Sequence, residues 1–232
     1  MKLSQKIFST AILSVSTLIV LSLIINKTIL INEQEPPEIN STELSNIDEI
    51  YLVGNLDVRI KKTSDKRSLK LSYPSKYILN HFDIYVDGKK LYLKQKRRLS
   101  NSKKGLALKA KIQIPQLRKI TVSGHSNTII DDFNGEKLVV KDSGNSLLKT
   151  TNSHYEKLYA SGSGFVQLRF KKLTATNISA RLTDSAKVYA LINGGTLSGK
   201  LEKQSQLIYF GHHSSNKIQV LDKSTLNYKG EL

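Results

Sequence analysis

The chain of 232 residues contains no cysteine. This absence excludes disulfide bonds, thiolate metal sites and thiol catalysis, and it also excludes a lipoprotein anchor, which needs a lipidated cysteine. Acidic residues are few, because 19 Asp and Glu stand against 36 Lys and Arg, which gives a net charge of +17. Such a charge favours contact with anionic polymers, or it serves solubility as a solvated surface.

The second half of the chain also lacks any capped segment with an apolar period of 3.6 residues, which argues against leucine-rich and helical repeats. Instead, an alternating strand followed by small residues returns about every twenty residues. The spacings between the lead apolar residues of the copies are 18, 20, 20, 19 and 21. These lead residues are Ile120, Leu138, Leu158, Ile178, Leu197 and Ile218. A fixed period of this length predicts a solenoid.

Each copy contains a strand, a corner of serine and glycine, and a second short strand. We therefore predict an all-β fold, a right-handed parallel β-helix with about 20 residues per coil, in which the lead residues are buried and stacked. Between Ile47 and Pro115 the alternation continues with longer bends, and Asp87-Gly88 indicates a tight turn. These residues are interpreted as the first, larger coils of the same solenoid.

The N-terminal segment differs from the rest. Residues 7–25 form 19 consecutive uncharged, mostly apolar positions, preceded by Lys2 and Lys6. The run is long enough to cross a bilayer as a helix, and the early lysines favour a cytoplasmic N-terminus. We predict an uncleaved signal anchor in residues 1–25, and a cleaved signal peptide is the alternative.

The predicted signal segment implies that the rest of the chain leaves the cytoplasm. Residues 33–46 are polar and acidic and include Pro36-Pro37, which is typical of a linker, and the linker is predicted to span residues 26–46. The β-helix domain is then predicted to span residues 47–232. We expect it in the periplasm or outside the cell, anchored in the inner membrane, or secreted if the N-terminus is cleaved.

Several motifs in residues 47–232 resemble one bacterial family. The most specific is Ile112-x-Ile114-Pro115-x-Leu117 leading into Val122-Ser123-Gly124, and Val86-Asp87-Gly88 precedes it. The chain resembles the auto-transporter adhesin head domain, or GIN domain, a domain family of unknown function. The resemblance implies a right-handed β-helix, an extracytoplasmic location and no established enzymatic activity. Some late coils depart from the Ser-Gly-x-Gly form, as at Thr183-Asp184-Ser185 and Lys203-Gln204-Ser205.

A dense basic cluster predicts an anion-binding loop. Between Asp87 and Lys119 there are twelve basic residues and one acid. The candidates for anion binding in this loop are Lys94, Lys96, Arg97, Arg98, Lys103 and Lys104. A solvated loop without a ligand is the alternative. Aromatic residues are not interleaved with the cluster, so specific nucleic-acid recognition is not expected.

Three more lysines are candidates for anion binding, because each precedes a lead residue by one position. Lys119, Lys137 and Lys157 are expected to form an outward column on successive coils, about 4.8 Å apart. Stacked like charges repel, so either a ligand offsets them or solvent and flexible stems relieve the repulsion.

Catalysis finds little support. Acidic residues occupy different offsets within their coils, whereas a glycosidase needs two carboxyl groups about 5–10 Å apart. We predict no catalytic residue, no metal site and no cofactor.

The predicted function is a membrane-tethered, adhesin-like binding or scaffold module for anionic glycans, lipopolysaccharide, lipid head groups or a protein partner. A polysaccharide-active β-helix enzyme, a lyase or glycosidase, is the alternative.

Overall fold

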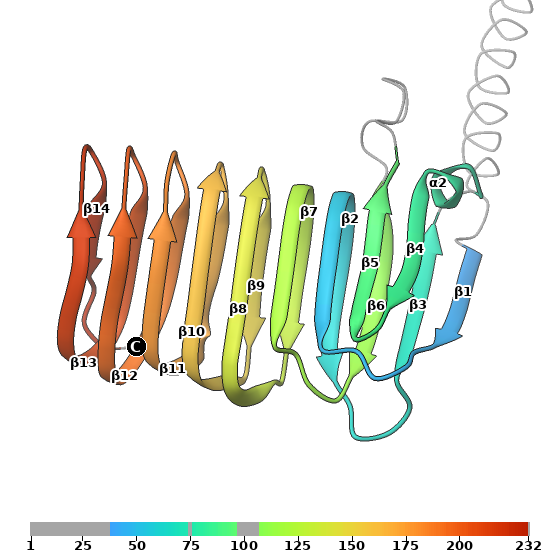
Figure 1. The fold of residues 1–232 in the computed structure, drawn as a ribbon, viewed down its shortest axis with the longest axis horizontal. Coiled ribbons are helices and arrows are strands. Elements are labelled where there is room, and N and C mark those ends of the chain that lie inside the picture. The colour runs from blue at the N-terminus through green and yellow to red at the C-terminus, as the bar shows by residue number, and fades with distance from the viewer. Residues whose placement is uncertain (1–37, 74–75, 97–106, 232) are drawn as a thin grey trace, which may run out of the picture. The chain divides into compact units, whose positions relative to one another are not determined.

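The computed structural model describes residues 38–73, 76–96 and 107–231, and these form a β-solenoid of about six turns (Figure 1). The predicted all-β solenoid is therefore confirmed. The elements are β1 (Glu38–Glu43), β2 (Glu49–Lys62), β3 (Ser68–Tyr73), α2 (Lys76–Asn80), β4 (Phe82–Asp87), β5 (Lys90–Gln95), β6 (Leu108–Ile114), β7 (Lys119–Asp131), β8 (Asn134–Gly144), β9 (Leu147–Thr151), β10 (Ser153–Gly164), β11 (Gln167–Leu182), β12 (Lys187–Leu201), β13 (Gln206–Val220) and β14 (Thr225–Tyr228).

The coils of the second half stack as parallel strands, because the repeat brings like residues to the same position in each turn. Leu138 of β8 lies opposite Leu158 of β10, which lies opposite Ile178 of β11 and then Leu197 of β12. Alternate residues of each strand point inward. The core is therefore a continuous stack of aliphatic layers along the solenoid axis, with polar residues outside.

The lead residues are buried at five of their six positions. The five are Ile120, Leu138, Leu158, Ile178 and Leu197. Ile218 is half-buried. The predicted stacking is wrong at both ends, since Ile120 lies opposite Val140 and Ile218 lies opposite Gly199. The reason is that the coils there contain 20 and 19 residues, whereas the motif copies are spaced by 18 and 21.

The first half of the domain departs from a simple succession of coils. β2 pairs with β7 on one edge and with β5 and then β6 on the other, so it lies out of chain order. β1 and β3 pair antiparallel, as do β3 and β6 and also β4 and β5. The interpretation of residues 47–115 as larger coils is therefore wrong for β3 and β4. An antiparallel cap covers the edge of the first coil, as the end of a solenoid requires.

The hairpin signal in the first half is confirmed. β4 and β5 are joined at Asp87-Gly88, with Asp87 opposite Lys90. Gly88 has a φ of 57°, a conformation that glycine adopts without strain. The hairpin places Tyr85 and Tyr92 opposite each other at the start of the solenoid.

The predicted linker of residues 26–46 is wrong over its last part. β1 pairs along its length with β3, and Leu44 is buried in the core. A polar strand suits this position, because an edge strand that is rich in hydrophilic residues does not invite further pairing. The predicted signal anchor of residues 1–25 lies outside the described residues. Within the described part of the chain, no helix has the length and apolar character to span a bilayer.

A column of glycines forms the corner at which the long strands bend. Gly54, Gly124, Gly144 and Gly164 lie opposite one another on successive coils, with φ between 84° and 121°. A Cβ on Gly144 would lie 2.6 Å from the carbonyl oxygen of Gly124. Both the backbone conformation and the close approach of the coils therefore require glycine. This corner divides the outer surface of the solenoid into two faces.

Candidate functional site

The two faces carry the outward side chains of the strand segments on either side of the corner. The first face is formed by the segments that precede it, with Tyr51 on β2 and Lys141 on β8 pointing outward. The second face is formed by the segments that follow it, with Arg59 on β2 and Lys149 on β9 pointing outward. Both faces carry cations that are candidates for anion binding. The cations of the two faces differ in whether acidic residues of the protein already neutralise their charge.

Three tyrosines stack on the first face at the N-terminal end of the solenoid. Tyr85, Tyr92 and Tyr51 lie on adjacent strands, and the ring centroids are 4.7 Å apart in both pairs. The Lys94 ammonium lies 4.7 Å from the Tyr92 centroid and donates a hydrogen bond of 3.1 Å to the Tyr85 hydroxyl. That bond raises the pKa of Lys94. Because the ring faces cover one another, mainly edges and hydroxyl groups remain for a ligand.

Lys119 extends this stack into an ion pair. Its ammonium donates to the Tyr51 hydroxyl at 2.7 Å, and that hydroxyl donates to the Glu49 carboxylate at 2.9 Å. The hydrogen bond to Tyr51 and the charge of Glu49 raise the pKa of Lys119. Burial acts to raise the pKa of Glu49, but the Tyr51 hydrogen bond and the Lys119 charge together lower it. The charge of Lys119 is thus already neutralised within the protein.

The predicted column of Lys119, Lys137 and Lys157 is only partly formed. Lys137 and Lys157 lie opposite each other, but the register of β7 and β8 displaces Lys119 by two residues. The Glu136 carboxylate lies 3.5 Å from the Lys157 ammonium, and the Tyr159 ring centroid lies 4.9 Å from the Lys137 ammonium. An acid and an aromatic ring therefore offset the repulsion between the two stacked lysines.

Only the start of the predicted basic loop can be placed. Lys94 contacts the tyrosine stack, and the Lys96 ammonium lies 3.1 Å from the Asp83 carboxylate. The other four members lie outside the described residues: Arg97, Arg98, Lys103 and Lys104. Anion binding by this loop stays a prediction.

A row of cations that sequence reasoning missed crosses the second face. Strand register places five cations on six consecutive strands, with Ile129 of β7 on the remaining one. The five, called the cation row below, are Lys70 of β3, Lys111 of β6, Arg59 of β2, Lys149 of β9 and Arg169 of β11. At one strand spacing per step, the cation row is about 24 Å long.

No member of the cation row forms an ion pair with a described acidic residue. The row leads to Tyr189 of β12, whose ring centroid has the ammonium groups of Lys171 and Lys187 each at 5.4 Å. Like charges directly opposite each other destabilise a sheet. The cation row therefore opposes folding unless an anion from outside the described chain neutralises it.

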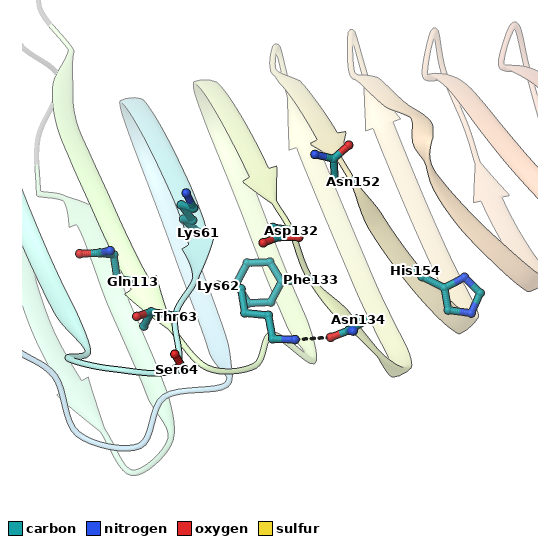
Figure 2. A pocket seen from close by; sticks show the side chains of 10 residues that line it. All are labelled: Lys61, Lys62, Thr63, Ser64, Gln113, Asp132, Phe133, Asn134, Asn152 and His154. Carbon is teal, nitrogen blue, oxygen red and sulfur yellow. Dashed lines mark hydrogen bonds between the residues drawn. The ribbon is translucent and has the colours of Figure 1, made fainter.

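A polar hollow of about 540 Å³ opens beside the cation row (Figure 2). Lys61 and Gln113 in its wall come two residues after Arg59 and Lys111 on the same strands, so they belong to the same face. The other wall residues are Lys62, Thr63, Ser64, Asp132, Phe133, Asn134, Asn152 and His154. Five of these ten residues carry amide or hydroxyl groups, and such groups hydrogen-bond to uncharged polar ligands.

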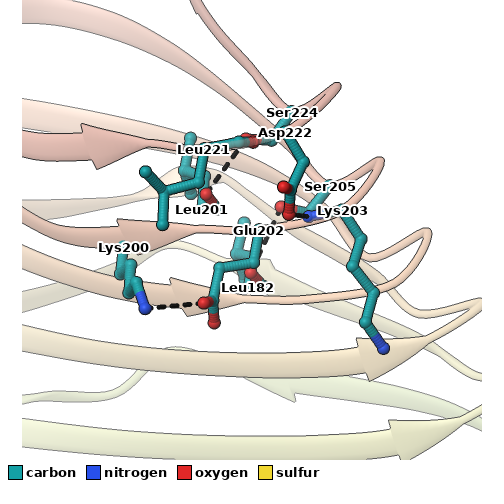
Figure 3. Close-up of polar contacts among 9 residues, drawn as sticks. All are labelled: Leu182, Lys200, Leu201, Glu202, Lys203, Ser205, Leu221, Asp222 and Ser224. Carbon is teal, nitrogen blue, oxygen red and sulfur yellow. Dashed lines mark hydrogen bonds and ion pairs between the residues drawn. The ribbon is translucent and has the colours of Figure 1, made fainter.

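The acidic residues of the late coils make structural contacts. Glu202 pairs with Lys200 at 2.6 Å, and Asp222 accepts a hydrogen bond of 2.9 Å from the backbone N–H of Lys203 (Figure 3). The Lys203 ammonium lies 2.5 Å from the Asp184 carboxylate, and this contact lowers the pKa of Asp184. A general acid needs the opposite shift, so the Asp184 carboxyl is poorly suited to act as the acid of a glycosidase.

The same residues replace glycine at the corner. Asp184, Lys203 and Asp222 have φ of 60°, 62° and 54°. The Asp184 carboxylate accepts a hydrogen bond of 3.2 Å from the N–H of Gly164, one coil earlier. Alternating charges on successive coils thus hold the left-handed corner where the Ser-Gly-x-Gly form is lost.

Asp142 is different, because its carboxyl lies inside the solenoid and is 4% exposed. It lies opposite Val122 on one coil and Gly162 on the next, and it accepts a hydrogen bond of 2.5 Å from Ser146. Burial raises the pKa of Asp142 to about 6, and the Ser146 hydrogen bond offsets part of that rise. A carboxyl sealed in the core cannot reach a polymer substrate, so its altered pKa concerns stability.

Replacing Asp142 by asparagine is expected to stabilise the fold at neutral pH. The folded-state pKa of about 6 lies above the unfolded value of about 3.9, so stability falls as the pH rises from about 4 to 6. The difference corresponds to about 3 kcal/mol, and we expect a gain of about 1–3 kcal/mol because the new amide loses some hydrogen bonding. Urea unfolding of both proteins at pH 4 and pH 8 measures the effect.

The exposed substitution Asp132→Asn is the control, and it should change the stability at pH 8 much less. Equal stabilities of the Asp142→Asn variant and the parent at pH 8 would contradict the assignment of Asp142 as a destabilising buried charge.

Solved structures share this fold. A putative adhesin from Bacteroides fragilis superposes with a TM-score of 0.62 at 13% identity, covering 84% of this chain and 97% of that one. A putative adhesin from Parabacteroides distasonis gives a TM-score of 0.56 at 15% identity, covering 83% and 97%. At such identities the likeness shows the fold alone.

Sequence comparison gives the family. A search of curated proteins finds no match. The profile of the family described as "Putative auto-transporter adhesin, head GIN domain" matches residues 46–230, which is most of the chain. The resemblance noted from the Ile-Pro-x-Leu and Ser-Gly motifs is thereby confirmed. The chain belongs to the family of putative auto-transporter adhesin head GIN domains.

Proposed function

We propose that this chain is a non-enzymatic, adhesin-like binding module of the bacterial cell envelope whose ligand is an anionic envelope polymer. Residues 7–25 hold it at the membrane, with the solenoid outside the cytoplasm. The observation that carries the proposal is the cation row, five outward cations without an acidic partner among the described residues. Membership of an adhesin head family supports the location and the binding role.

The physical basis is a rigid surface that presents charge at fixed intervals. Nearly all crossovers between parallel strands are right-handed, and we take these coils to wind in the same sense. Stacked parallel coils hold equivalent outward side chains one strand spacing apart. A polymer with many anionic groups can contact several of these cations at once, so weak single contacts add up. The net charge of +17 also draws anionic ligands to the surface.

The test is binding of the purified full chain, kept in a neutral detergent, to immobilised polymers at a series of salt concentrations. We expect binding to heparin and polygalacturonate but not to neutral dextran. Affinity should fall steeply with salt, because screening shortens from about 30 Å at 0.01 M to about 8 Å at physiological ionic strength. Binding to dextran as strong as to heparin, or binding that does not respond to salt, would contradict the proposed function.

A further inference from the structure

We propose that the cation row binds a linear anionic polysaccharide whose chain runs along the solenoid axis, with about one sugar unit on each strand. This inference rests on the proposed function, because it takes an anionic polymer as the ligand and then gives its chemical class, position and direction. The residues that carry it are Lys70, Lys111, Arg59, Lys149 and Arg169.

The direction follows from the columns on either side of the cation row. Asp57 of β2, between Lys109 and Asn127, lies in the column on one side. Asp131 of β7, next to Lys61, lies in the column on the other side. Positive charge is therefore concentrated in a line along the axis. A flat anionic membrane would contact the flanking acids as well, whereas a narrow polymer follows the line.

The spacing of the cation row matches an extended polysaccharide. Adjacent strands lie about 4.8 Å apart, and an extended chain of pyranose units advances by a similar distance per unit. Each carboxylate or sulfate can therefore meet the cation of one strand. Arg59, near the middle of the row, offers a planar guanidinium that binds such groups through two hydrogen bonds. Ile129 lies opposite Arg59 on the next strand, and it is the one position along the six strands of the row that carries no charge.

The surroundings of the cation row favour sugars over nucleic acids. Single-stranded nucleic acids are held by aromatic side chains on which successive bases stack. Tyr189 lies at one end of the row, and the five cation positions and Ile129 carry no ring. The polar hollow beside Arg59 and Lys111 instead offers amide and hydroxyl groups (Figure 2). These groups suit the hydroxyl groups of a sugar unit adjacent to the row.

The first face provides the contrast. Its column through Tyr51, Thr121 and Lys141 alternates aromatic, hydroxyl and basic residues. Its neighbouring column contains the Lys119–Glu49 ion pair. Cations on that face are scattered or already paired, so a polymer finds no continuous line of charge there.

The test compares two triple variants of the full chain that remove the same charge. The row variant carries Arg59→Gln, Lys111→Gln and Lys149→Gln. The control variant, on the first face, carries Lys137→Gln, Lys141→Gln and Lys217→Gln. Because the replaced row residues form no ion pair with described acids, the row variant should melt at the same temperature as the parent or higher.

Binding to heparin at 0.15 M salt should weaken at least tenfold in the row variant and less than about threefold in the control. Each contact between a cation and the polymer releases about one counterion from the polymer. The loss of three contacts should therefore reduce the steepness of log affinity against log salt by about two to three in the row variant. Affinity for heparin oligosaccharides should rise with length up to about six sugar units, the number of strands in the row, and then level off. Polygalacturonate should behave in the same way.

The outcomes separate this inference from the proposed function. If the parent binds no anionic polymer, the proposed function fails and this inference fails with it. If the parent binds but both triple variants lose affinity equally, charge alone matters and only the cation row is overturned. Stronger binding of phosphatidylglycerol vesicles than of heparin would also overturn it, as would loss of heparin binding confined to the loop variant Arg97→Glu with Arg98→Glu.

Discussion

Replacing Leu158 by alanine is expected to lower the free energy of unfolding by about 2–5 kcal/mol. Leu158 is 1% exposed and lies between Leu138 of the preceding coil and Ile178 of the next. Each neighbouring layer is fixed by its own strand hydrogen bonds, so the coils cannot close over the missing side chain. A cavity between two aliphatic layers results, and its cost adds to the lost burial of the leucine.

Chemical denaturation measures this effect, with the neighbouring substitution Tyr159→Ala as the control. Tyr159 is 41% exposed on the first face, so its removal should cost much less. A midpoint for Leu158→Ala within error of the parent would show that the solenoid does not pack in this register.

Replacing Gly144 by alanine is expected to cost about 3 kcal/mol or more. Gly144 has a φ of 121°, which side chains with a Cβ rarely adopt. The new Cβ would also lie 2.6 Å from the carbonyl oxygen and 2.8 Å from the nitrogen of Gly124. Because both atoms belong to backbone that is hydrogen-bonded between coils, the clash forces the coils apart rather than moving a flexible side chain.

Gly88→Ala separates the two causes. Gly88 also has a positive φ, of 57°, but an added Cβ there meets nothing within 4 Å. This control should cost only about 1–2 kcal/mol for the left-handed backbone. Thermal melts of the two variants compare the costs directly. Equal destabilisation would show that close stacking of the corners adds nothing, and it would contradict the glycine column.

The repeat made most of the fold predictable from the sequence. The period of about twenty residues and the alternation around Leu138, Leu158 and Ile178 specify both the solenoid and its core, since a one-residue slip would turn these side chains outward. The motifs around Pro115 and Gly124 made the family predictable as well. The antiparallel cap and β1 were not predictable in this way, because they occur once and have no second copy to align.

The cation row, too, could be predicted only where its residues belong to the repeat. Ile129, Lys149, Arg169 and Tyr189 are 20 residues apart, so the period alone aligns them. Arg59 joins them only because β2 lies out of chain order, and Lys111 and Lys70 join through β6 and the antiparallel β3. Likewise, the 18-residue step between Lys119 and Lys137 suggested a lysine column that the 20-residue coil does not align.

Lysine acetylation footprinting of the full chain, with and without a heparin hexasaccharide, tests the position of the polymer most directly. Exposed lysines react freely until a bound anion covers them, and mass spectrometry reads the change at each residue. We expect Lys70, Lys111 and Lys149 to lose reactivity several-fold, while Lys141 and Lys217 on the first face keep theirs. Equal protection on both faces, or protection of Lys141 and Lys217 with the row unchanged, would contradict a polysaccharide site on the cation row.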